Sequence, residues 1–329
     1  MPTIAHCDLD SYCLLAGFLD DQPVFVTANG EITLLGEKQK VVEAHEGIAS
    51  VALSRDKKSI ITGGEDGRIC RTTSALQCSE LARHEKKWIT SVAAGPDNSY
   101  AFAFSRTAWA DGGKGANGGK GLQEFDHERS VEDLAFAPKG LRFAVARYNG
   151  VTLHWLGADT KPTDLTWKGA HFAVTFSPDG RYVISSMQEN ALHGWRLSDE
   201  QHLRMSGYPA KVKSWSWSAK GKWLATSGAP AAIVWPFQAK DGPMGKAPLE
   251  LGTRADAMVT CVCCHPEEDI VAAGFNDGMI LFIRFADAKE VLLRRPGKGA
   301  ISTMAWDDKG YRLAFGTESG EAGIIDISA

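Results

Sequence analysis

The chain has 329 residues, with 36 Lys and Arg against 40 Asp and Glu and a formal net charge of −4. Because a basic excess is absent, we expect neither nucleic acid nor an anionic membrane as the main partner. No apolar run is long enough to span a bilayer, and Asp8 and Asp10 precede the N-terminal apolar run, where a signal peptide carries positive charge. The seven Cys lack framework spacing, which favours free thiols and predicts a cytoplasmic protein.

A sequence pattern recurs along the chain at intervals of about forty residues. It consists of two runs in which apolar and polar residues alternate, separated by a polar turn. In chain order the eight copies are residues 12–27, 48–63, 89–104, 131–146, 172–186, 212–227, 259–274 and 301–316, of which the first is the weakest. The fifth copy is the cleanest, with Ser177-Pro178-Asp179-Gly180 at its turn. There Pro fixes φ and Gly accepts a positive φ, so each copy reads as two antiparallel strands.

A second turn follows most copies, as at Asn29-Gly30, Asp66-Gly67, Asn149-Gly150 and Asp277-Gly278. These dipeptides are strong hairpin signals and introduce a third strand, after which a fourth leads to the next copy. Four antiparallel strands per forty residues is the period of a propeller blade. We predict an all-β fold, a closed β-propeller of four-stranded antiparallel blades forming one domain over residues 1–329. Eight blades are preferred, and seven is the alternative if the first copy is an irregular extension.

The two ends of the chain predict how the ring closes. The last copy supplies three strands and stops at Ala329, whereas Pro2–Asp8 is a short extended segment before the first copy. We therefore expect this N-terminal segment to be the fourth strand of the last blade.

Two segments carry a family resemblance. Residues 173–186, AVTFSPDGRYVISS, are followed by a strand that ends at Trp195, and residues 43–69 contain His45 and the Asp66-Gly67 turn. Both are similar to the repeat of the WD40 family, in which this chain looks like a divergent member of bacterial type. Leu, Arg and Pro follow Trp155, Trp195 and Trp235, where the family has Asp. The family's Asp–His–Ser/Thr–Trp network is therefore expected in few blades.

The resemblance implies a non-enzymatic scaffold that binds a protein or peptide through the loops joining fourth to first strands and second to third strands. Aromatic and Arg side chains bury large areas at interfaces at low entropic cost, so such residues in these loops are the candidates for binding. The candidate partner-binding residues are Trp88, Arg147, Tyr148, His171, Phe172, Gln188, Tyr208 and Phe275. The alternative for each is that it fills a gap between blades. We expect a monomer without a cofactor, and the partner's identity stays open.

Two other functions compete with the scaffold. Cys261, Cys263, Cys264 and His265 offer ligands that suit zinc, although strand alternation places Cys264 on the face opposite Cys261 and Cys263. An enzyme with a central-channel site would need converging polar groups, and Glu132-Asp133 is the only pair of carboxylates near an inner strand.

Three further segments read as surface structure. The Gly-rich stretch 112–121 fails the P-loop spacing, because Gly121 follows Gly119-Lys120, and it predicts a flexible hairpin in the third blade. Residues 239–248 predict a long loop in the sixth blade. Lys86-Lys87 and Arg294-Arg295 predict solvated turns.

Overall fold

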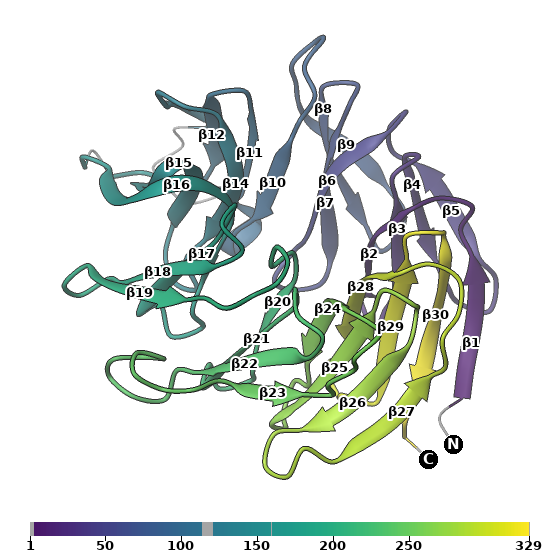
Figure 1. The fold of residues 1–329 in the computed structure, drawn as a ribbon. Helices are drawn as coiled ribbons and strands as arrows, with labels where there is room; N and C mark the ends of the chain where they lie inside the picture. The colour runs from purple at the N-terminus through teal and green to yellow at the C-terminus, as the bar shows by residue number, and fades with distance from the viewer. Residues whose placement is uncertain (1–2, 114–120, 159, 329) are drawn as a thin grey trace. The chain divides into compact units, whose positions relative to one another are not determined.

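The computed structural model describes residues 3–113, 121–158 and 160–328, and in this part of the chain the regular structure is almost entirely antiparallel β-strand. Contacts divide the chain into two compact units. We call residues 42–204 the middle unit and residues 1–41 with 205–329 the terminal unit. Figure 1 shows their strands in chain order.

The middle unit contains three sheets. The first comprises β6 (Ile48–Leu53), β7 (Ser59–Gly64), β8 (Arg68–Thr73) and β9 (Cys78–Arg83). The second comprises β10 (Ser91–Ala94), β11 (Tyr100–Phe104), β12 (Thr107–Asp111) and β13 (Gln123–Asp126), with the 3-10 turn η1 (Pro96–Asn98) between its first two strands. The third comprises β14 (Val131–Phe136), β15 (Arg142–Trp155), β16 (Thr163–Phe176), β17 (Tyr182–Met187), β18 (Leu192–Arg196) and β19 (Gln201–Met205).

The terminal unit contains four sheets of four strands. One comprises β2 (Cys13–Leu19), β3 (Gln22–Thr27), β4 (Glu31–Leu34) and β5 (Lys40–Glu43). The next comprises β20 (Trp215–Trp217), β21 (Trp223–Thr226), β22 (Ala232–Pro236) and β23 (Leu249–Leu251). It is followed by β24 (Val259–Cys264), β25 (Ile270–Phe275), β26 (Ile280–Arg284) and β27 (Glu290–Arg294). The last comprises β28 (Ile301–Trp306), β29 (Arg312–Thr317), β30 (Glu321–Asp326) and β1 (Thr3–Asp8).

The N-terminal strand completes the last sheet. β1 pairs antiparallel with β30 from Thr3↔Asp326 to Asp8↔Glu321, and Figure 1 shows the first and last strands side by side. The pairing supplies the backbone partners that the edge of β30 lacks within the last repeat. The prediction for this segment is confirmed in its pairing, and the fold is an all-β propeller architecture of four-stranded antiparallel blades.

The prediction of eight separate blades is wrong in its count, because the strands of the described residues form seven sheets. The fourth and fifth copies share the six-stranded sheet. Asn149 and Gly150 take positive φ values of 64° and 135° inside β15, and the pair Tyr148↔Ala170 continues the ladder across the junction. The first half of β16 therefore pairs with β15 and its second half with β17. The first copy is not an irregular extension, since β2 to β5 form a regular sheet.

The turn residues act as their chemistry requires. Ser177 Oγ donates to Asp179 Oδ1 at 2.6 Å, and Gly180, with φ of 74°, donates its N–H to Ser177 O at 2.8 Å. At the second turns the space is tighter. A Cβ on Gly67 would lie 2.1 Å from the carbonyl oxygen of His84, so this position accepts only Gly.

Hydrogen bonds from side chains at one recurring position join the innermost strands. In the middle unit, Ser50 Oγ accepts the N–H of Val92 at 3.0 Å, and Asp133 Oδ2 accepts the N–H of Val174 at 2.9 Å. In the terminal unit, Ser214 Oγ accepts the N–H of Val262 at 3.1 Å. The bonds of Ser50 and Ser214 join successive sheets, whereas that of Asp133 joins two strands of the six-stranded sheet.

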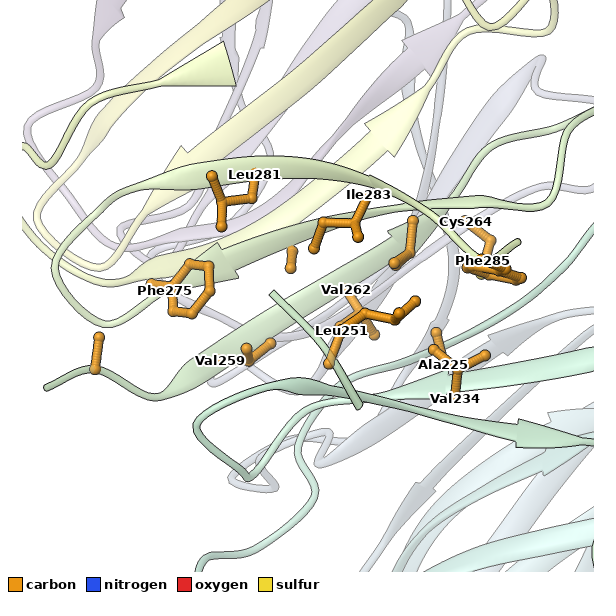
Figure 2. Close-up of a cluster of buried hydrophobic side chains, with 14 residues drawn as sticks. Ala225, Val234, Leu251, Val259, Val262, Cys264, Phe275, Leu281, Ile283 and Phe285 are labelled. Carbon is orange, nitrogen blue, oxygen red and sulfur yellow. The ribbon is translucent and has the colours of Figure 1, made fainter. Parts of the chain in front are cut away.

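Apolar side chains fill the spaces between neighbouring sheets. Figure 2 shows one such cluster in the terminal unit, where Val259, Val262 and Phe275 meet Val234 and Leu251 of the preceding sheet. Each sheet thus buries its faces only by stacking on its neighbours, which is how repeat architectures gain stability.

Candidate protein-binding surface

Three of the predicted partner-binding residues are buried, so they cannot contact a partner. Phe275 is 0% exposed, and its ring lies under the guanidinium of Arg254 at 5.2 Å. His171 is also 0% exposed; its Nδ1 lies 2.7 Å from Ser185 Oγ and its Nε2 lies 3.0 Å from the carbonyl oxygen of Trp167. The gap-filling alternative therefore describes both residues.

Tyr208 is the third buried candidate, and it completes a hydrogen-bond chain. Trp235 Nε1 donates to Tyr208 Oη at 2.6 Å. Thr226 Oγ1 donates to the carbonyl oxygen of Ile233 at 2.9 Å, so Tyr208 donates to Thr226 across their 2.7 Å contact. Burial raises the pKa of Tyr208 to about 12 despite these bonds. Tyr208 therefore links the indole of Trp235 to the hydroxyl of Thr226 in the interior of the unit.

The remaining candidates lie in the middle unit, and they differ in exposure. Trp88 is 63% exposed and Tyr148 is 48% exposed. Gln188 is exposed, whereas Phe172 and Arg147 are partly buried. A few of the predicted loop residues are thus accessible to a partner. Among them, Tyr148 is exposed and also borders two pockets.

We call the Tyr148 surface the group formed by Tyr148 and the two pockets that its side chain borders. One pocket, of about 250 Å³, is also lined by Trp167, Met187 and Glu189. The other, of about 340 Å³, is also lined by residues around His127. An exposed aromatic ring between two pockets can contact a partner whose side chains enter the pockets on either side of the ring.

Arg147 makes the base of this surface rigid. Its Nε donates to Thr152 Oγ1 at 2.8 Å, one terminal nitrogen donates to Asp164 Oδ1 at 2.6 Å, and the other donates to the carbonyl oxygen of Tyr148 at 3.2 Å. Burial alone would raise the pKa of Asp164, but hydrogen bonds from Thr152 and Arg147 hold it below its usual value. Arg147 is thus a positioning residue for the Tyr148 loop.

Two histidines form the wall of the larger pocket. The rings of His127 and His154 lie 5.2 Å apart, and burial lowers the pKa of both, that of His154 to about 4. Both rings are therefore neutral at physiological pH. His154 is not recognisable from the sequence because it lies near the end of a third strand, where nothing distinguishes it from a core residue.

The terminal unit has a pocket of its own at the starts of its inner strands. About 270 Å³ in volume, it is lined by Tyr12, Lys213 and Glu318 over the apolar Val259 and Ile301. Tyr12 is 40% exposed, and burial together with neighbouring Glu318 raises its pKa. This pocket is not predictable from the sequence, because the first copy of the repeat is the weakest and Tyr12 resembles a strand residue there.

The side chains of the Cys cluster do not converge on one point among the described residues. Cys261 and Cys263 pack in one apolar cluster with Trp306, whereas Cys264 packs in another with Val262, as Figure 2 shows for Cys264. Burial raises the pKa of Cys261 to about 11 and that of Cys264 to about 12. His265 Nε2 lies 3.0 Å from the carbonyl oxygen of Gly310. Among the residues described, no three His, Cys, Asp or Glu are placed to hold a metal ion.

Other predicted features are located as follows. The Gly-rich stretch connects β12 to β13 as expected, but its residues 114–120 lie outside the described part of the chain. The 239–248 insertion joins β22 to β23. Glu132 is exposed, whereas Asp133 joins inner strands. Across the three described ranges, the structure contains no helix able to cross a membrane.

Comparison with known proteins agrees with the architecture. The family model described as the WD domain, G-beta repeat, matches residues 36–70, and that of the anaphase-promoting complex subunit 4 WD40 domain matches residues 260–329. These matches support the WD40 repeat family. The transcription initiation factor TFIID subunit 5 of Caenorhabditis elegans is 23% identical over 161 residues, which are 49% of this chain and 24% of that protein. The chain thus matches about a quarter of its curated relative's length.

A solved structure extends the likeness to nearly the whole chain. The crystal structure of the computationally designed Ika8 protein covers 97% of this chain and 98% of its own, with a TM-score of 0.75 and 17% identity. At this identity the likeness concerns the fold alone. WD40 propellers generally act as protein-interaction scaffolds and are typically not enzymes, whereas the bacterial type inferred from the missing Trp-Asp pairs stays a prediction.

Proposed function

We propose that this WD40-repeat chain is a non-enzymatic scaffold that binds a partner protein or peptide through the Tyr148 surface. The observation that carries the proposal is the position of Tyr148, a half-exposed ring between two pockets on a loop fixed by Arg147. A rigid aromatic on a loop loses little entropy on binding and buries a large area. A cytoplasmic location and a monomeric state are part of this proposal.

The two pockets make different demands on the partner. The pocket beside Trp167 and Met187 has an apolar wall with Glu189 and Arg204 at its edge, and it suits an apolar side chain. The pocket beside His127 has more polar neighbours, including Glu128 and Arg129, and it suits a polar one. A segment with adjacent apolar and polar side chains would fill both.

The test measures partner recovery by immobilised protein from an extract of the source organism. Tyr148→Ala is expected to lower recovery of the bound protein by about tenfold or more, because interface aromatics contribute about 2 kcal/mol each. Tyr311→Ala is the matched control, since Tyr311 is 54% exposed but lies at a first turn in the terminal unit. Equal recovery by the wild type and the folded Tyr148→Ala variant would contradict the proposal.

A further inference from the structure

The outer strand β27 of the terminal unit exposes neighbouring apolar side chains. Val291 and Leu292 are 46% and 45% exposed. The order of the sheet places β27 at its edge, with β26 as its neighbour. Proteins usually protect such edges with charged residues, Pro or a cover, so two exposed aliphatic side chains at an edge call for a partner.

Leu292 borders a groove between two outer strands. The groove has a volume of about 520 Å³ and is lined by Leu292 and Leu293 of β27 and by Ile4 and His6 of β1. β1 is itself the outermost strand of its sheet. Leu293 is 4% exposed and belongs to an apolar cluster against which Ile4 packs, so the groove has an apolar floor.

Arg294 fixes the end of this groove. Its guanidinium forms an ion pair with Glu321 at 2.6 Å, lies 5.0 Å from the ring centre of Phe315 and donates a hydrogen bond to the carbonyl oxygen of Gly278. Its side chain is only 4% exposed. The expectation of a solvated Arg294-Arg295 turn is therefore wrong for Arg294, and the positive charge of Arg294 is already neutralised by Glu321.

Positive charge without a counterion remains at the rim. Arg295 and Lys298 are exposed, and neither forms an ion pair within the described residues. Arg295 follows β27 directly and lines the groove, whereas Lys298 comes three residues later in the chain and lies outside the lining. An apolar groove with a cationic end is complementary to a peptide segment in which aliphatic and acidic side chains lie next to one another.

We propose that the β27–β1 groove binds an extended acidic segment of a partner protein, with an aliphatic side chain against Leu292 and a carboxylate against Arg295. This surface is separate from the Tyr148 surface and does not depend on it. Extended peptides commonly bind at exposed sheet edges, where alternate side chains enter pockets. The rim charges give the binding a salt dependence, because exposed ion pairs are screened.

The experiment selects a phage-displayed library of random peptides on the full chain and measures the enriched peptides by fluorescence polarisation. Peptides with Asp or Glu beside Leu, Ile or Val are expected, with affinity falling when sodium chloride rises from about 0.05 M to about 0.5 M. Leu292→Asp and Arg295→Glu are each expected to weaken binding by about tenfold. Tyr148→Ala is expected to leave these peptides bound, so failure here and failure of the proposed scaffold surface are separable.

Val291→Asp is the matched control. Val291 is as exposed as Leu292 but points to the opposite face of the same strand, and this variant is expected to bind within about twofold of the wild type. Three results would overturn the proposal: no enrichment of acidic-aliphatic peptides, equal binding by the Leu292→Asp and Arg295→Glu variants, or self-association of the chain that Leu292→Asp abolishes. The last result would assign the groove to a second copy.

Discussion

The middle and terminal units brace their sheets with different side chains. Seven of the nine His lie in the middle unit: His45, His84, His127, His154, His171, His193 and His202. There His45 Nδ1 lies 3.0 Å from Asp66 Oδ1 and its Nε2 lies 2.8 Å from Thr62 Oγ1 on the second strand. In the terminal unit Tyr208 makes the equivalent contact to Thr226 on β21.

Guanidinium groups lie over buried rings in both units, as Arg71 does over Tyr100 and Arg181 over Tyr182 in the middle unit. In the terminal unit the rings belong to three Phe residues. Arg254 lies over Phe275, Arg294 over Phe315 and Arg312 over Phe18, at 5.2, 5.0 and 5.0 Å from the ring centres. A phenol and a guanidinium keep their protonation states through the acid range, whereas an imidazole does not. One structural task is thus done by titrating and by non-titrating groups. Most of the titrating ones lie in the middle unit, whereas the terminal unit keeps the buried His265, which contacts the carbonyl oxygen of Gly310.

Acidification should destabilise the middle unit first, and this is the largest effect expected. Burial lowers the pKa of His154 to about 4 and that of His193 to about 3, both below the unfolded value near 6.5. Their contribution is full above pH ~6.5 and is lost as the pH falls toward the folded values. Protonation of the buried Asp133 over the same range is stabilising and partly offsets the loss from the two His. From pH ~7 to ~4.5 the net fall in the free energy of unfolding should be about 3 kcal/mol.

The measurement is urea-induced unfolding at both pH values, with limited proteolysis mapped by mass spectrometry. Cleavage within residues 42–204 should precede cleavage elsewhere at low pH. His6→Gln is the control, because the His6 side chain is 57% exposed and lies in the terminal unit. Simultaneous cleavage of both units at pH 4.5 would contradict the prediction that the middle unit is the more sensitive to acid.

Tyr208→Phe tests the brace of the terminal unit. The change removes the Oη that accepts from Trp235 Nε1, so a buried donor loses its partner. We expect a loss of about 2 kcal/mol in the free energy of unfolding. Because no group with a pKa near neutrality is involved, the loss should be equal at pH 7 and pH 5. The comparison is with Tyr311→Phe at an exposed site, and a pH-dependent loss would contradict the assignment.

Asp133→Asn should produce the smallest change, and a stabilising one. Burial raises the pKa of Asp133 to about 6, so its ionisation in the folded chain is unfavourable. The folded pKa exceeds the unfolded one, so stability falls as the pH rises from ~4 to ~6. An Asn can still accept the N–H of Val174 and bond Ser91, and we expect a gain of about 1 kcal/mol at pH 7.

The measurement for Asp133→Asn is thermal unfolding across this pH range. Glu132→Gln, at the exposed neighbouring residue, is the control and should leave the profile unchanged. A lower melting temperature for Asp133→Asn than for the wild type at pH 7 would contradict this prediction, because it would show that the ionised carboxylate stabilises the folded chain.

Local signals predicted the repeats well and the binding residues poorly. The Ser177–Gly180 turn and the pairing of the N-terminal strand follow from residue types and spacing. Tyr208 and Phe275 look like Tyr148 in the sequence, since all three are aromatics near loops. Burial divides them, and burial depends on which side chain of a neighbouring sheet fills the adjacent space.

The sequence by itself determined the strand order, the turn chemistry and the period of the repeat, because each depends on residues close together in the chain. Tertiary structure alone decided that two repeats share one sheet, that the Cys thiols occupy separate clusters and that the edges of β27 and β1 form a groove. These outcomes join residues far apart in sequence, and the packing of neighbouring sheets rather than any local pattern fixes them.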